Sequence, residues 1–277
     1  MLFIFCLTAT AASPGAETLP KVASTNLCAD LLLLEIADPT QIVSVSYQSQ
    51  DPRVSPVADI ARAYPANRGA VEELLYLKPE IALVYTGWTG RRHANLLAGQ
   101  GIEILATPYP KDWADTLSTV RKIAARIGRS EVGEAKSAQA EQRMRKLAER
   151  ARPYSLLYLR PSGGTAGANT YVDDVLSALG LRNHAAERGY SGWGRFPLEH
   201  LVNAPPDLIL LGFFDQAQAL SNSAYGRHPL FKKLLEQTPT ISVPSNLWGC
   251  GGLELVVAAE QIAAQIDGLD LDRSETR

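Results

Sequence analysis

Two segments of the chain, residues 71–84 and residues 198–211, repeat one pattern. In each, a stretch typical of a short helix ends before a proline, because proline cannot continue a helix, and an apolar run typical of a buried strand follows. A repeat this far apart is too distant for a solenoid and predicts two similar lobes with a cleft between them. The matching pairs include Glu72 with Glu199, Leu74 with Leu201, Pro79 with Pro206 and Leu83 with Leu210.

The rest of the chain alternates between short apolar runs and helical stretches. This alternation predicts an α/β fold of two similar α/β lobes with mostly parallel sheets, bridged by one long helix. We assign residues 20–128 to the N-terminal lobe, residues 153–268 to the C-terminal lobe and the charged residues 269–277 to a disordered tail. Strands are expected at 21–24, 41–45, 81–85, 103–106, 155–159, 208–211 and 240–243, with an irregular segment at 47–68.

The bridging helix is assigned to residues 129–152. This segment is rich in charged residues and carries one narrow apolar stripe, and Ser130 is a suitable N-cap. Such a helix would be a rigid connection between the lobes rather than a flexible linker. The same periodicity also fits a solvated helix that belongs to the first lobe alone.

The first residues have the pattern of a secretory signal peptide. Met1 to Leu7 is apolar, and a run of small residues with an Ala-x-Ala match at Ala9 to Ala11 follows. We therefore assign residues 1–19 to a signal peptide and linker and expect an exported protein. The positively charged region that opens such a peptide is missing, which indicates a start upstream of Met1. The alternative is an unstructured N-terminus of a cytosolic protein.

The three cysteines agree with export. Cys6 lies in the apolar run, so cleavage would leave Cys28 and Cys250. An even pair in an oxidising compartment favours a disulfide. Because the two residues follow the first and last predicted strands, we expect the bond at the mouth of the cleft. Two buried free thiols are the alternative, since cysteine is among the most buried residues.

Aromatic side chains gather where predicted strands end or helices begin. Ligands of parallel α/β sheets bind at the carboxyl ends of strands, and rings there suit a large, partly apolar ligand. Arg160, in a glycine-rich loop, is a candidate partner for an anionic ligand group. For each single ring, packing within its own lobe is the alternative. The predicted ligand-binding residues are Tyr47, Tyr85, Trp88, Tyr109, Arg160, Trp193, Phe213 and Trp248.

Charge and motifs exclude several classes of protein. A formal net charge of −2 provides no basic field for nucleic acid. The four histidines are scattered without a metal-binding spacing, so we predict no metal site and no cofactor. The glycine-rich loop at 160–169 lacks the P-loop and dinucleotide-binding motifs. The absence of a nucleophile elbow disfavours an enzyme.

Taken together, residues 20–267 resemble the periplasmic binding proteins that serve cobalamin and ferric-siderophore importers of the ABC class. The residues that carry the resemblance are 21–30, the two repeat units at 72–81 and 199–207, and the charged helix between the lobes. The resemblance implies two α/β lobes bridged by a long helix, with little hinge motion. It also implies that Glu72 and Glu199 match the glutamates that dock onto arginines of the membrane permease.

The resemblance implies a periplasmic, monomeric protein that delivers its ligand to a permease and ATPase complex. The aromatic rim with one arginine favours a corrinoid ligand, with haem or a ferric siderophore as the alternative. Two other classes stay open: a secreted two-domain enzyme with its active site in the same cleft, and a binding protein that serves a signalling receptor.

Overall fold

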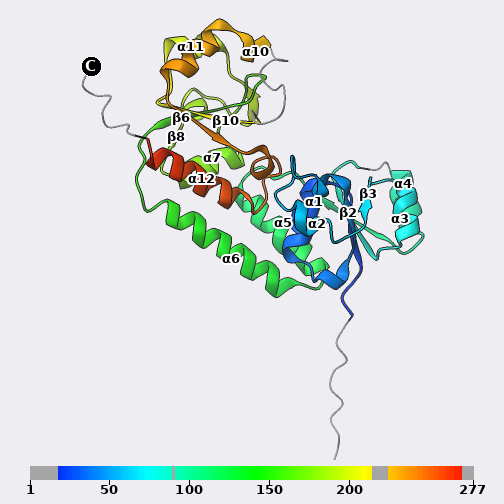
Figure 1. The fold of residues 1–277 in the computed structure, drawn as a ribbon. Helices are drawn as coiled ribbons and strands as arrows, with labels where there is room; N and C mark the ends of the chain where they lie inside the picture. Colours follow the sequence, from blue (N-terminus) through cyan, green and yellow to red (C-terminus); the bar gives the residue numbers. More distant parts are fainter. Residues whose placement is uncertain (1–17, 89–90, 214–223, 270–277) are drawn as a thin grey trace, which may run out of the picture.

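The computed structural model describes residues 18–88, 91–213 and 224–269. They form two α/β lobes that lie along one long helix (Figure 1). In the described ranges no helix is long and apolar enough to cross a membrane. The predicted signal peptide and the predicted tail fall almost entirely outside the described residues, so both stay predictions.

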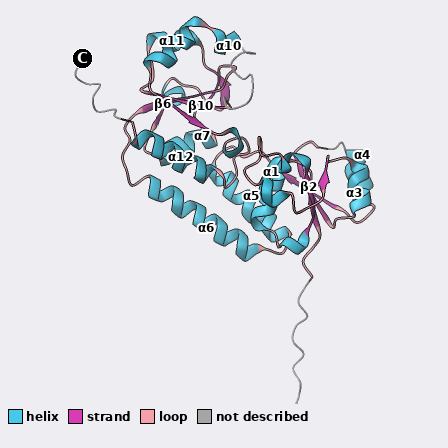
Figure 2. Ribbon diagram, viewed as in Figure 1, coloured by secondary structure: helices cyan, strands magenta, loops and turns pink. Residues whose placement is uncertain are grey.

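The N-terminal lobe is built on a five-stranded parallel sheet with the strand order β3-β2-β1-β4-β5. Helices pack on its two faces (Figure 2). The strands are β1 (Val22–Ser24), β2 (Ile42–Ser46), β3 (Ala66–Asn67), β4 (Ile81–Tyr85) and β5 (Glu103–Thr107), and the helices are α1 (Leu27–Ile36), α2 (Ala58–Ala61), α3 (Val71–Leu77), α4 (Arg91–Ala98) and α5 (Trp113–Arg126), with 3-10 turns η1 (Pro39–Gln41) and η2 (Tyr47–Gln50).

The C-terminal lobe has a four-stranded parallel sheet with the order β11-β10-β6-β8, and a small antiparallel pair, β7-β9, beside it. Its strands are β6 (Ser155–Leu159), β7 (Gly164–Ala166), β8 (Arg182–Asn183), β9 (Trp193–Arg195), β10 (Leu208–Gly212) and β11 (Thr240–Val243). Its helices are α7 (Tyr171–Ala178), α8 (His184–Glu187), α9 (Leu198–Asn203), α10 (Ala224–Arg227), α11 (Pro229–Gln237) and α12 (Leu255–Asp267), with the 3-10 turn η3 (Ser245–Leu247).

The sequence repeat occupies the same place in both lobes. In each sheet the first strand of the lobe lies beside the strand of the repeat, β1 beside β4 and β6 beside β10. The helices of the repeat, α3 and α9, bury Leu74 and Leu201 against their own sheets. The α3 helix ends at Leu77 and is capped by Lys78, which has a left-handed φ of 47° just before Pro79. The predicted α/β fold with two similar lobes is confirmed.

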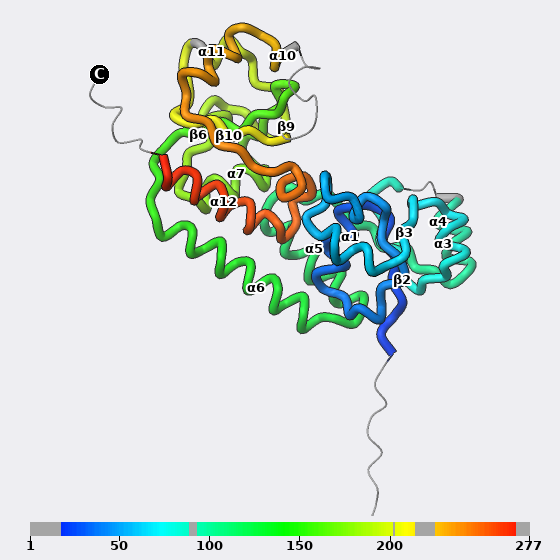
Figure 3. The backbone as a smooth tube through the Cα atoms, viewed as in Figure 1, coloured from blue at the N-terminus to red at the C-terminus, as the bar shows by residue number. Residues whose placement is uncertain are grey.

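The long helix α6 (Ser130–Leu147) contacts both lobes. At one end Gly133 lies so close to α5 that an added Cβ would stand 2.3 Å from the Cβ of Ala124. Farther along, Met144 is part of the core of the C-terminal lobe. Arg143 forms an ion pair of 2.6 Å with Glu260 of α12. The helix therefore connects the lobes rather than belonging to the first alone, and the tube view follows it along both (Figure 3).

The helix is shorter than the expected span of 129–152. It ends at Leu147, and the buried Arg152 folds back beneath it. The Arg152 guanidinium donates to the carbonyl of Leu147 at 3.1 Å and pairs with Asp267 at 2.9 Å. These contacts turn the chain into β6, and they depend on α12, which lies far along the sequence. Helical periodicity alone could not indicate them.

Candidate ligand-binding cleft

The loops at the carboxyl ends of the two sheets meet between the lobes. Cys28, at the start of α1 after β1, forms a disulfide with Cys250, which follows β11 and η3. The Cα atoms of the pair are 5.2 Å apart. The bond lies where the sequence predicted it, and it joins the loop that leaves the first strand to the loop that leaves the last.

Hydrogen bonds reinforce this junction. The hydroxyl of Tyr109, in the loop after β5, lies 2.7 Å from the hydroxyl of Tyr171 on α7 and 3.2 Å from the carbonyl oxygen of Gly249. The Thr116 hydroxyl of α5 donates to the carbonyl of Gly251 at 2.6 Å. Side chains of the N-terminal lobe therefore fix the loop before α12, which carries Cys250.

The wall on the C-terminal lobe is an arginine stacked between two rings. The Arg160 guanidinium lies 4.7 Å from the ring centre of Trp193 and 4.6 Å from that of Phe213. Its Nε donates to the buried Tyr158 hydroxyl at 2.9 Å. Among the described residues no carboxylate pairs with Arg160, and its guanidinium lies against rings instead.

The N-terminal lobe also has an arginine over a ring, in this case a single ring and an arginine that the sequence did not single out. The Arg68 guanidinium lies 5.2 Å from the ring centre of Tyr47. Arg68 is exposed, and in the described ranges it forms no ion pair. Tyr85, at the end of β4, is half exposed, and Trp88 donates to the Gly69 carbonyl at 2.9 Å, so its indole is anchored to its own lobe.

Trp248 is wrong as a ligand contact. Its side chain has no exposed surface, and it packs 5.8 Å from the ring of Tyr158 and 6.0 Å from the ring of Tyr171. The turn η3 directs the indole into the core, beneath the rings that face the cleft. Tyr171 was missed, although it supports both Tyr109 and Trp193, because a buried tyrosine on a helix has no distinctive local pattern.

Glu72 and Glu199 lie in the first turns of α3 and α9, and both are exposed. The α3 helix begins directly after the carboxyl end of β3, so its start lies at the ligand edge of the sheet. The two glutamates therefore occupy matching places of the two lobes. Their docking role stays a prediction.

One buried pair resembles part of a catalytic set. The Ser155 hydroxyl lies 2.7 Å from Nδ1 of His184. Both residues are buried, and Ser155 begins β6 at the edge of the sheet opposite the ligand loops. Burial lowers the pKa of His184 to about 4, with the Arg188 charge as a further cause. A pair closed to solvent at this edge has no access to a substrate in the cleft.

The described residues contain no group of three or more histidine, cysteine, aspartate or glutamate side chains that could hold a metal ion. The buried carboxylate of Asp30 instead joins strands. It accepts hydrogen bonds from the hydroxyls of Ser24 and Ser46 and from the Ser46 backbone at 2.9 Å. Burial raises its pKa to about 6, partly offset by these bonds. Asp30 therefore holds α1 against β1 and β2 behind the cleft.

Comparisons with known proteins agree with this geometry. The sequence profile of a family described as "Periplasmic binding protein" matches residues 22–213, so the chain belongs to that family. A comparison with curated protein sequences found no match. The family comprises substrate-binding proteins of ABC importers, a class of transport proteins rather than enzymes, and the resemblance drawn from the sequence is confirmed.

Solved structures share the fold at low sequence identity. The periplasmic haem-binding protein RhuT from Roseiflexus sp. RS-1 has a TM-score of 0.68 at 19% identity, over 90% of this chain and 98% of its own. HutB of Vibrio cholerae, also a periplasmic haem-binding protein, has a TM-score of 0.70 at 18% identity, over 88% of this chain and 98% of its own. The periplasmic vitamin B12 binding protein BtuF of Vibrio cholerae has a TM-score of 0.62 at 16% identity, over 90% of this chain and 97% of its own.

The first prediction concerns the disulfide. A chain that begins after residue 19, denatured without reduction, should contain no free thiol in a thiol-counting assay. Changing both Cys28 and Cys250 to serine should lower the free energy of unfolding by about 5 kcal/mol, because the bond closes a loop of 222 residues. Two free thiols in the unreduced protein, or a double variant as stable as the original, would contradict the bond.

The second prediction concerns pH. His184 has a pKa of about 4 when folded against 6.5 as a model value, so its contribution to stability is complete above pH 6.5 and is lost as the pH falls through 4. The loss is about 3 kcal/mol. His184→Asn should therefore show a shallower fall of the unfolding free energy between pH 6.5 and 4 in urea titrations. His200→Asn, at an exposed position, is the control. Equal slopes for all three proteins would refute the assignment.

Proposed function

We propose that this protein is the periplasmic substrate-binding component of an ABC importer for a tetrapyrrole, which it captures as a monomer and delivers to a permease and ATPase complex. The observation that carries the proposal is the pair of arginines, one on each lobe: Arg68 lies over the ring of Tyr47, and Arg160 lies over the rings of Trp193 and Phe213. Stacked rings suit the faces of a macrocycle, and free guanidinium groups suit anionic groups at its edges.

Two tetrapyrroles remain candidates. The aromatic rim predicts a corrinoid, and the similarity to the vitamin B12 binding protein BtuF supports it. The second arginine supports haem, because haem carries two carboxylates and each wall has one free guanidinium group. The similarity to RhuT and HutB, described as haem-binding proteins, also supports haem. A ferric siderophore fits the charges but makes less use of the rings.

The third prediction tests the cleft. Trp193→Ala should weaken binding of the preferred tetrapyrrole by about 2 kcal/mol, roughly thirtyfold, because it removes a ring that is 40% exposed and stacked on Arg160. Tyr76→Ala is the matched control, since Tyr76 is 86% exposed near the end of α3 away from the ligand edge. Titrations of cobalamin, haem and ferric siderophores followed by tryptophan fluorescence measure both variants.

The same titrations decide between the ligands. Replacing Arg68 and Arg160 with methionine keeps an apolar side chain on each ring and removes both charges. A carboxylate-bearing haem should lose about 1.5–3 kcal/mol for each arginine, and an amide-rich corrinoid should lose less. Saturation only by a ferric siderophore would replace the tetrapyrrole with the alternative ligand. No response to any of the three classes would refute the proposal.

The fourth prediction concerns the permease. Changing both Glu72 and Glu199 to alanine should leave ligand affinity and folding unchanged, because both side chains are exposed outside the aromatic walls. Transport into cells or proteoliposomes that contain the cognate permease should fall, and more than in either single variant, because charge pairs set the orientation of docking. The control changes Glu131 and Glu236, two exposed glutamates outside the repeat. Normal transport by the double variant, or loss of ligand binding, would contradict the docking role.

A further inference from the structure

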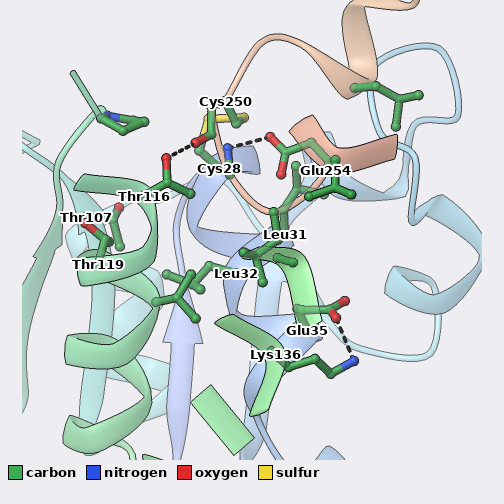
Figure 4. Close-up of a pocket in the computed structure, with 18 of the residues that line it drawn as sticks. Cys28, Leu31, Leu32, Glu35, Thr107, Thr116, Thr119, Lys136, Cys250 and Glu254 are labelled. Atoms are coloured by element: carbon green, nitrogen blue, oxygen red, sulfur yellow. Dashed lines mark hydrogen bonds and ion pairs between the residues drawn. A yellow bond between two sulfur atoms is a disulfide. The ribbon is translucent and has the colours of Figure 1, made fainter. Parts of the chain in front are cut away.

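A cavity of about 450 Å³ lies at the junction of the lobes, next to the disulfide. Its walls come from α1, α5, α6 and the first turn of α12, together with the loop that carries Cys250. In the close-up the disulfide lies at one end and the Glu35–Lys136 ion pair at the other, with Leu31 and Leu32 between them (Figure 4). The volume is within the range of small-molecule sites, which is about 300–1,000 Å³.

This cavity is separate from the stacked walls of the cleft. Arg160, Trp193, Phe213 and Tyr47 are not among its lining residues. Its lining includes Tyr85 and Tyr109, which end or follow strands of the N-terminal sheet, and the loop that carries Cys250, while the rest comes mostly from α1, α5, α6 and α12. Most of that surface is aliphatic, from Leu31, Leu32, Val120, Ala140, Leu253, Val256 and Val257.

Some charged side chains of the cavity have a partner of opposite charge, and one does not. The Lys136 ammonium lies 2.7 Å from Glu35 and is neutralised there. Arg143 forms two hydrogen bonds with Glu260, of 2.9 and 2.6 Å. Glu254 has no such partner: in the part of the chain that the structure describes it forms no ion pair, and its carboxylate accepts a backbone hydrogen bond from Gly252 at 2.9 Å. One carboxylate therefore faces an apolar chamber without a cation.

Burial raises the pKa of Glu254 to about 7, with the nearby Glu35 charge as a smaller cause in the same direction. Glu254 is partly buried, so its ionised carboxylate is less well solvated than one at the surface. A cation that enters the chamber would replace the missing solvation and favour the ionised form, whereas a neutral molecule of the same shape would gain only the apolar contacts.

We propose that this chamber is a second binding site, for a small amphipathic organic cation whose ammonium or amidinium group pairs with Glu254 and whose apolar body lies against Leu31 and Leu32. The occupant contacts α1 and α5 of one lobe and α12 of the other, so its binding stabilises the junction. The site does not depend on which ligand the cleft takes.

The test compares benzylamine with benzyl alcohol, which has a similar shape and no charge. Calorimetric titration of the whole protein at pH 8 should show benzylamine binding roughly tenfold more tightly, because an ion pair with a poorly solvated carboxylate adds a charge-assisted bond. Benzylamine should also raise the melting temperature in proportion to the logarithm of its concentration. At pH 5.5 its advantage should disappear, since Glu254 is then protonated.

Glu254→Gln should make the two probes bind equally at pH 8, because it keeps the shape of the side chain and removes its charge. Glu236→Gln, on the exposed face of α11, is the matched control and should change nothing. Val257→Phe, which fills the chamber from α12, should abolish binding of both probes and serves as a second variant if Glu254→Gln fails to fold.

Three outcomes would overturn the proposal. The first is equal affinity of benzylamine and benzyl alcohol for the original protein, and the second is an amine preference that survives Glu254→Gln. Trp193→Ala, which lies in the cleft, should bind benzylamine as the original protein does. Amine binding that is lost with Trp193 would place the amine in the cleft instead and would also overturn the proposal.

Discussion

The geometry of the cleft depends on the covalent and polar junction between the lobes. The Cys28–Cys250 bond joins points that are 222 residues apart, and the hydroxyls of Tyr109 and Thr116 bind across the same junction. In the chain-entropy account such a bond lowers the conformational entropy of the unfolded chain, which raises the free energy of unfolding by about 5 kcal/mol. It also fixes the edge at which both sheets present their loops. The loops of the two lobes are therefore joined before any ligand arrives, which lowers the cost of ordering a site between them.

The helix α6 attaches the lobes to each other a second time, behind the cleft, so the lobes cannot simply rotate about the disulfide junction. The helix α6 lies against α5 through Gly133 and against α12 through Arg143. The lobes are thus held at the cleft by the disulfide and behind it by a helix about 27 Å long. A movement of one lobe would have to bend this helix or break its contacts. The chamber beside Glu254 lies between the two attachments.

The repeat made the architecture predictable, because its helix, proline and apolar strand are local patterns that need no tertiary information. What escaped prediction depends on distant contacts. Strands β3 and β8 have two residues each, too few to show the alternation of side chains that identifies a strand in a sequence. They form only as edge strands of their sheets. The end of α6 at Leu147 is set by Arg152 and Asp267. Trp248 follows a predicted strand and was therefore expected at the ligand edge, yet the turn η3 directs its side chain into the core. Arg68 was missed because a single arginine after an irregular segment carries no local signal.

Under the proposed function, Arg68 and Arg160 would give a protein with a formal net charge of −2 a site for an anionic group. Here the guanidinium groups of Arg68 and Arg160 lie over rings, which hold the side chains without cancelling their charge. Stacking also restricts their rotamers, so less freedom is lost when an anionic group binds. In the proposed site the positive charge comes from two individual side chains, so it does not require a positive net charge of the whole molecule.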